Sequence, residues 1–239
     1  MPRHSFVLWS IPLVALLATA GAARAATQNV SLSFASLPSA QGFTYTPSGS
    51  HLGTLEANVF SVGGGALIQN SMGLGYGVSG GSILYNGLTG LLNATEPKQL
   101  RVMARCLQVE GSGLGAAGQQ GFGFGFTTGS VQYDVSVTPT QVFALGPSGT
   151  VTVPGTYDNT QFHHFVLEFT PPGTQRIYRD GVLLYTSTSG FAVAANRVFL
   201  GDATGGANAR AEIISFQFVQ NFATPVQSTS WGRVKQLFR

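Results

Sequence analysis

Apolar and polar residues alternate with a period of two through nearly every patterned segment of this chain. A period of two sends alternate side chains to opposite faces of a strand, whereas an amphipathic helix requires a period near 3.6. The alternation predicts strands at 29–34, 42–45, 58–62, 66–69, 99–109, 121–127, 131–137, 141–145, 150–153, 162–170, 175–179, 182–185, 197–201 and 211–220. Many short strands separated by Gly and Pro turns indicate an all-β sandwich or barrel.

Two short motifs predict local structure within this pattern. In QRIYRDGVLLYT, Asp180 and Gly181 separate two alternating runs, which favours a hairpin because a type I′ turn needs positive φ at both central residues. In GFGFGF, Phe122, Phe124 and Phe126 point to one face, where we expect them to fill a core. The intervening glycines leave room on the other face for a neighbouring backbone or a flat ligand.

The two ends of the chain differ from its body. Residues 1–25 begin with Arg3, continue through an apolar run and end on Ala23-Arg24-Ala25, which predicts a secretory signal peptide cleaved after Ala25. We therefore expect a secreted protein of the extracellular space or cell envelope. Residues 26–222 form the predicted sandwich domain, because their length suits one all-β domain.

Residues 223–239 form a basic tail. Trp231, Val234 and Phe238 are spaced as on one face of a short helix, with basic residues around them. Such a segment could contact a membrane surface or an export or anchoring partner. A frayed tail that orders on a partner is the favoured interpretation, because so short a helix is marginal in water.

The basic isoelectric point does not indicate a nucleic-acid partner. Of the 12 basic residues, two lie in the signal segment and three in the last seven residues, so the body has seven against nine acids. Nucleic-acid binding requires clustered Lys and Arg on one face. The sequence thus argues against a nucleic-acid partner.

The single cysteine, Cys106, excludes an intrachain disulfide framework. It continues the alternating series of Leu100, Val102 and Ala104, so we expect a buried small hydrophobic side chain. No histidine lies near it in sequence to activate it as a nucleophile.

Three segments occur in a familiar order: FHHFVLEF at 162–169, YRDGVLL at 178–184 and AEIISFQF at 211–218. This order resembles the concanavalin A-like lectin/glucanase superfamily, and most of all its laminin-G-like and pentraxin-like domains, over residues 160–220. The resemblance implies a jelly-roll β-sandwich of two antiparallel sheets. It also implies glycan binding and calcium binding in loops, which are common among members, and β-glucan hydrolysis in the glucanases.

Hydrolytic chemistry is disfavoured by the spacing of the carboxylates. The glucanase branch carries acids at a Glu-x-Asp-x-x-Glu spacing on one strand, but no two of the nine acids here lie within four residues of each other. A retaining glycosidase needs two carboxyl groups about 5–5.5 Å apart. Acids of different strands could still meet, so an enzyme remains an alternative.

His163 and His164 are adjacent on a predicted strand and therefore point to opposite faces. They cannot easily bind one metal together, and a core or cross-strand hydrogen bond by one of them is expected.

The Gly-rich segment after 201 allows two interpretations. It lacks the lysine and the following helix of a phosphate-binding loop. Asp202, Asn208 and Glu212 offer the oxygen ligands that calcium prefers, so they are candidate metal ligands. Equally, Asp and Asn side chains could hold the loop by bonding to backbone N–H groups.

Sugar binding usually combines aromatic faces with planar polar side chains. Tyr76, Tyr85, Asn86 and Asn208 are the candidate ligand-binding residues, since segment 69–87 is polar and Gly-rich and could form a binding rim or an ordinary long loop. The chain has further tyrosines at 133, 157 and 178. The favoured function is a non-catalytic, lectin-like module for a polysaccharide or glycoconjugate. The alternatives are a cell-surface structural or adhesion module and a glycoside hydrolase or polysaccharide lyase.

Overall fold

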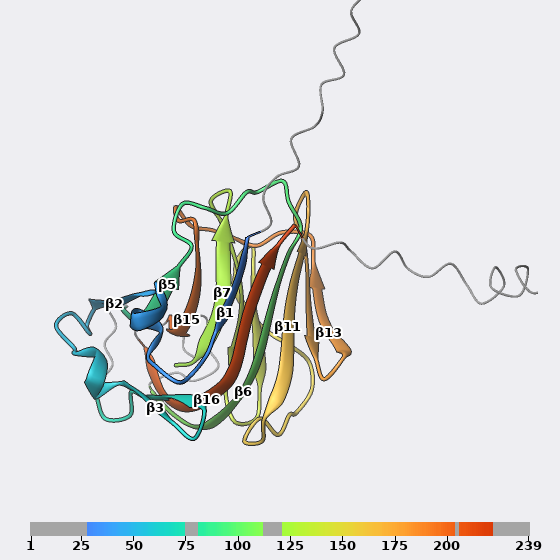
Figure 1. Cartoon of the computed structure of the whole chain (residues 1–239). Helices are drawn as coiled ribbons and strands as arrows, with labels where there is room; N and C mark the ends of the chain where they lie inside the picture. The colour runs from blue at the N-terminus through green and yellow to red at the C-terminus, as the bar shows by residue number, and fades with distance from the viewer. Residues whose placement is uncertain (1–27, 75–80, 112–120, 204–205, 222–239) are drawn as a thin grey trace, which may run out of the picture.

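The chain folds into a jelly-roll β-sandwich of two antiparallel sheets, as predicted (Figure 1). The computed structural model describes residues 28–74, 81–111, 121–203 and 206–221. The predicted signal peptide, 1–25, and the tail, 223–239, lie outside these residues and stay predictions. In the described part of the chain, no helix is long and apolar enough to cross a membrane.

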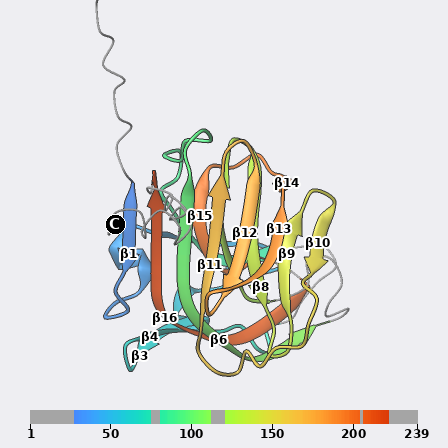
Figure 2. The same cartoon turned by 90° about the vertical axis from the view of Figure 1, so that its right-hand side faces the viewer.

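Each sheet has eight strands. Sheet I runs in the order β13 (Val182–Ser187), β12 (Thr174–Arg179), β11 (His163–Thr170), β6 (Lys98–Gly111), β16 (Ala207–Gln220), β4 (Ala66–Asn70) and β3 (Phe60–Gly63), with β1 (Asn29–Leu32) also paired to β16 (Figure 2). Sheet II runs in the order β10 (Gly149–Thr152), β9 (Val142–Gly146), β8 (Val131–Val137), β7 (Gly123–Thr128), β15 (Arg197–Asp202), β5 (Gly81–Gly87) and β2 (Thr44–Gly49), with β14 (Phe191–Ala192) paired to β8. Two 3-10 helices, η1 (Pro38–Gln41) and η2 (Glu56–Asn58), precede β2 and β3.

Several predicted boundaries were wrong for identifiable reasons. The strand expected at 42–45 begins at Thr44, because Gly42 adopts φ 88° at the end of η1. Pro47 lies within β2, where its missing N–H is tolerated because β2 is an edge strand. The strand expected at 58–62 begins only at Phe60, after η2. Part of the expected long loop 69–87 is strand β5, and β16 begins at Ala207 rather than at 211.

The core lies between the sheets and is rich in phenylalanine. Phe122, Phe124 and Phe126 are at most 1 % exposed, as the GFGFGF motif predicted. The glycines on the other face serve a close backbone approach, since a Cβ atom on Gly125 would collide with the carbonyl oxygen of Tyr133. That finding favours the neighbouring-backbone interpretation.

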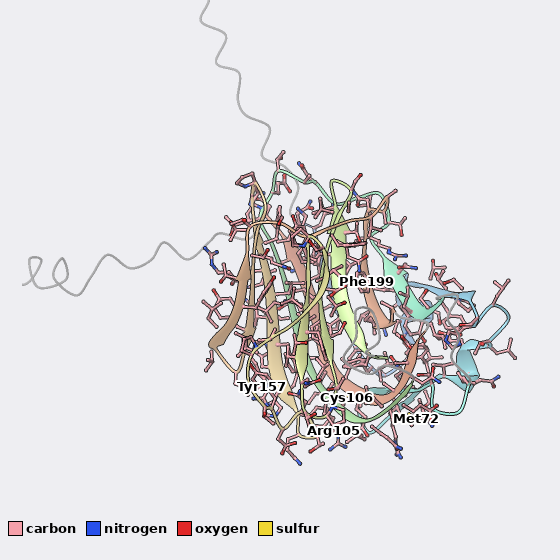
Figure 3. All side chains as sticks on the ribbon, turned by 180° about the vertical axis from the view of Figure 1, so that it is seen from behind. Met72, Arg105, Cys106, Tyr157 and Phe199 are labelled. Carbon is pink, nitrogen blue, oxygen red and sulfur yellow. The ribbon has the colours of Figure 1, made fainter. Side chains whose placement is uncertain are left out.

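Cys106 is a buried member of this core, as expected (Figure 3). Burial raises the pKa of its thiol to about 12, so the thiolate is disfavoured at neutral pH. A thiol in this state is not a nucleophile.

The predicted hairpin at Asp180 and Gly181 is confirmed. Asp180 has φ 52° and Gly181 has φ 80°, the two positive values of a type I′ turn, and they join β12 to β13.

Substituting Gly181→Ala should lower the free energy of unfolding by about 1–2 kcal/mol, because an L side chain is strained at positive φ. Chemical denaturation would measure it. Gly63→Ala is the matched control, since an added Cβ there meets only Ile68 at 3.8 Å and φ is ordinary. Equal losses in the two variants would show that the turn geometry is not responsible.

Candidate functional site

The outer face of sheet I carries a set of polar side chains in register. Arg101 of β6 lies opposite Val166 of β11, and Val166 lies opposite Tyr178 of β12. Two residues further along the same pair of strands, Gln99 of β6 lies opposite Glu168 of β11. Neighbouring strands are about 4.8 Å apart, so these residues, distant in sequence, form one continuous surface.

A shallow, open groove of about 270 Å³ lies in this surface. Its described lining residues are Gln99, Arg101, His164, Val166, Glu168, Tyr178 and Gly181. Val166 is the one short aliphatic side chain among longer neighbours, and on a pleated sheet a short side chain between long ones leaves a hollow. The floor of the groove is therefore apolar and its walls are polar.

The polar walls are connected by hydrogen bonds. Gln99 Nε2 donates to Glu168 Oε1 at 2.6 Å, and Arg101 Nε donates to Gln99 Oε1. Tyr178 also bonds to Glu168, and burial and the Glu168 charge together raise the pKa of the Tyr178 phenol. The planar ends of these side chains are thus held in place before any ligand arrives.

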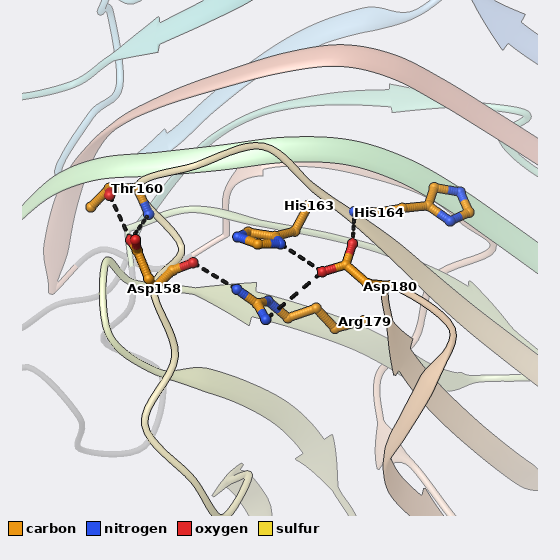
Figure 4. Close-up of polar contacts among 6 residues, drawn as sticks. All are labelled: Asp158, Thr160, His163, His164, Arg179 and Asp180. Carbon is orange, nitrogen blue, oxygen red and sulfur yellow. Dashed lines mark hydrogen bonds and ion pairs between the residues drawn. The ribbon is translucent and has the colours of Figure 1, made fainter.

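The Asp180 turn fixes one end of the groove (Figure 4). The Asp180 carboxylate accepts the His164 N–H at 3.0 Å and pairs with His163 Nδ1 at 2.6 Å. Figure 4 shows the His163 ring directed toward Asp180 and the His164 ring directed away from it. The opposite orientations and the cross-strand bond expected of this histidine pair are both confirmed.

Competing influences act on the Asp180 carboxyl. Burial would raise its pKa, but the His164 N–H, His163 and Arg179 outweigh burial, so the pKa lies below its ordinary value. The turn is therefore held most firmly above the ordinary pKa of an aspartate, and this support is lost as the pH falls through the lowered value.

The groove offers one carboxylate, not two. Among its described lining residues only Glu168 is acidic, and Gln99 and Tyr178 already bond to it. Double-displacement glycoside hydrolysis needs a second carboxyl group about 5–5.5 Å away. The groove therefore lacks, among its described lining residues, the carboxyl pair of a double-displacement hydrolase.

The three candidate metal ligands do not form one set. Glu212 lies on the outer face of sheet I in an ion pair with Arg105, at 2.8 Å. Asn208 is buried and donates to Glu110 at 3.1 Å, while Asp202 is buried at the end of β15. Within the described ranges, no three His, Cys, Asp or Glu side chains are grouped to hold a metal ion. Glu212 is therefore already paired with Arg105 and lies four residues along β16 from Asn208, while calcium at Asp202 and Asn208 stays a prediction.

The candidate sugar-contact residues also lie apart. Tyr85 is fully buried, its ring 4.6 Å from that of Phe60 and its hydroxyl bonded to Glu56. Asn86 points to the opposite face of β5 and donates to Thr46 at 2.9 Å. Tyr76 lies outside the described residues. None of the three described candidates lines the groove on sheet I. Tyr85 and Asn86 lie on β5 of sheet II, where a rim loop was expected, and Asn208 lies on β16 outside the groove.

A second polar set lies on the outer face of sheet II. Asp134 is in one row with Gly125, Phe199 and Asn86, and Phe199 is labelled in Figure 3. Burial raises the pKa of the Asp134 carboxyl to about 6, although Gln132 donates to it at 2.7 Å. Asp134, Phe199 and Asn86 are at most 9 % exposed. These three side chains are therefore largely covered in the folded protein.

Sequence reasoning missed the groove. Gln99, Arg101, His164, Glu168 and Tyr178 each appear in the sequence as an ordinary outward residue of an alternating strand. The alternation predicts the strands that carry them, β6, β11 and β12. The register that places these residues side by side depends on the tertiary structure and is not visible in the sequence.

Comparison with known proteins gives a likeness of shape only. No family model matches the chain, and no curated protein matches it in sequence. Solved structures similar to it include a carbohydrate esterase from the Shiga toxin-encoding bacteriophage phi24B. The two sequences are 15 % identical, the match covers 82 % of this chain and 90 % of the esterase chain, and the TM-score is 0.46.

Two further structures are similar to a comparable degree. One is a β-1,3-1,4-glucanase (lichenase) from a mouse hindgut metagenome, with 13 % identity, 81 % and 98 % coverage and a TM-score of 0.46. The other is the alginate lyase AlgAT5 of polysaccharide lyase family 7, with 10 % identity, 72 % and 87 % coverage and a TM-score of 0.49. All three TM-scores are below 0.5, so no activity or residue role is carried over to this chain.

Proposed function

We propose that this protein binds carbohydrate without cleaving it, at the groove on the outer face of sheet I. The observation that carries the proposal is Tyr178, which stands beside an apolar floor among the planar polar ends of Gln99, Arg101 and Glu168. A sugar ring presents apolar C–H faces and a rim of hydroxyl groups. An aromatic side chain matches the faces, and amide, guanidinium and carboxylate groups match the hydroxyls.

The size and openness of the groove suit a short stretch of a glycan. Its volume of about 270 Å³ is below the roughly 300–1,000 Å³ typical of sites for drug-sized ligands. An open groove also lets a longer chain continue on either side. We therefore expect recognition of one or two sugar units within a polysaccharide or glycoconjugate.

The same proposal includes an exported location, on the basis of the signal peptide predicted at 1–25. It does not require calcium, because none of the groove's described lining residues belongs to the candidate metal ligands Asp202, Asn208 and Glu212.

A glycan and polysaccharide array with the purified protein, in calcium and again in EDTA, tests the proposal. We expect binding that is retained in EDTA. Binding that EDTA abolishes would move the site to calcium-holding loops, and a folded protein that binds no glycan would exclude the proposed function.

Tyr178→Ala should weaken glycan binding about 10- to 30-fold, since truncating a central aromatic contact commonly costs about 2 kcal/mol. Tyr178→Phe keeps the ring and should stay within about fivefold of the wild type, because it loses only one hydrogen bond. Isothermal titration calorimetry measures both. Phe191→Ala, an aromatic 38 % exposed on β14, is the matched control and should not change affinity. Wild-type affinity in Tyr178→Ala would place binding elsewhere.

A further inference from the structure

We infer that the glycan bound in the groove is anionic, carrying a carboxylate or sulfate group that pairs with Arg101. This inference rests on the proposed function and adds the chemical class of the ligand. It follows from the balance of charges around the groove.

The other charges on this part of the sheet are balanced. Arg105 forms an ion pair with Glu212 at 2.8 Å. Arg176 of β12 lies directly opposite Glu168 of β11, and opposite charges at facing positions of antiparallel strands attract each other. Arg101 has no acidic group within 4.0 Å among the described residues, so its charge is the one left unbalanced beside the groove floor.

Arg101 is also oriented for a ligand. Its side chain is exposed, and the bond from its Nε to Gln99 Oε1 fixes the plane of the guanidinium group. The two terminal nitrogens have no hydrogen-bond partner among the described residues. A guanidinium held in this way presents a planar fork of donors, which matches the two oxygens of a carboxylate or sulfate.

The side chains that line the groove differ from one end to the other, which predicts how the ligand lies. His164 and Glu168 are four residues apart on β11, a distance of about 13 Å at about 3.3 Å per residue. Arg101 lies opposite Val166, between these two positions, and its Nε bonds to Gln99, so the acidic group of the ligand should lie at the terminal nitrogens of Arg101. Neutral hydroxyl groups should lie at the Glu168 end, where a carboxylate can accept hydrogen bonds.

Matched pairs of glycans test the inference. Binding of the purified protein to oligogalacturonate is compared with its methyl-esterified form, and binding to sulfated dextran oligosaccharides is compared with unsulfated dextran. We expect the charged member of at least one pair to bind tenfold or more tightly, and this preference to shrink at high salt. The pair that shows the preference identifies the acidic group as carboxylate or sulfate.

Arg101→Gln should remove about tenfold or more of the affinity for the charged glycan and should weaken binding of its uncharged partner less, so that the preference for the charged member is lost. Arg210→Gln is the matched control, because Arg210 is likewise exposed on sheet I but does not line the groove, and it should change neither affinity beyond about twofold. Thermal melts would show that both variants are folded.

The outcomes separate this inference from the proposed function. Equal binding of charged and uncharged partners, preference for the uncharged ones, or an acidic preference that survives Arg101→Gln would overturn the inference while leaving carbohydrate binding intact. A folded wild-type protein that binds no glycan at all would overturn both.

Discussion

Replacing Phe126 by alanine is expected to lower the free energy of unfolding by about 3–5 kcal/mol. The ring is fully buried on β7 of sheet II and contacts aromatic rings of both sheets. Its centroid is 5.8 Å from Tyr133 in its own sheet, and 6.4 Å from Phe169 and 5.8 Å from Phe218 in sheet I. Removing the ring would leave a cavity where the two sheets meet, and the neighbouring rings are too rigid to fill it.

Urea denaturation followed by circular dichroism measures this loss. Phe191→Ala removes the same side chain from an exposed position and should cost less than about 1 kcal/mol. A similar small loss for Phe126→Ala would mean that the contacts between the sheets do not limit stability.

Asp134→Asn is expected to raise the free energy of unfolding by about 2–3 kcal/mol above pH 7. Burial raises the pKa of the Asp134 carboxyl to about 6, from an ordinary 3.8. The folded protein therefore holds this proton more tightly than the unfolded chain does, and stability falls as the pH rises from about 4 to about 6. A neutral asparagine does not carry this cost, and its side-chain oxygen can still accept the Gln132 hydrogen bond.

The pH dependence separates this charge effect from a change of packing. The advantage of Asp134→Asn should disappear below about pH 4, where aspartate is neutral in both states. Asp158→Asn is the control, and it should lower rather than raise the free energy of unfolding at neutral pH. The reason is that hydrogen bonds from Thr160 lower the pKa of the Asp158 carboxyl, so its charged form stabilises the folded protein. An advantage of Asp134→Asn that is independent of pH, or a loss at pH 8, would contradict the assignment.

Much of the fold could be predicted because its determinants are local. Alternation assigned Phe122, Phe124 and Phe126 to the core, and the Asp180-Gly181 pair specified a hairpin through backbone sterics alone. The segment 69–87 was harder, because glycines surround β5 and obscure its short apolar run. That run becomes a strand because β15 and β2 pair with it on either side.

The site could not be predicted for a different reason. Tyr178 was one of several tyrosines, and no local feature distinguishes it from Tyr85, which is in the core. What makes Tyr178 useful is that β11 places Val166 and Glu168 beside it, and that depends on the order of strands in the sheet. Closeness in sequence is no better a guide at the candidate metal ligands, since Asn208 bonds to Glu110 while Glu212 pairs with Arg105.

The alternation along β11 also affects how this protein could be evolved or engineered. Phe165, Leu167 and Phe169 belong to the core, while His164, Val166 and Glu168 line the groove. One strand therefore carries two interleaved sets of positions with separate tasks. A library randomised only at 164, 166 and 168 could explore new ligand specificities while the residues that hold the sandwich together stay unchanged, so most of its members should still fold.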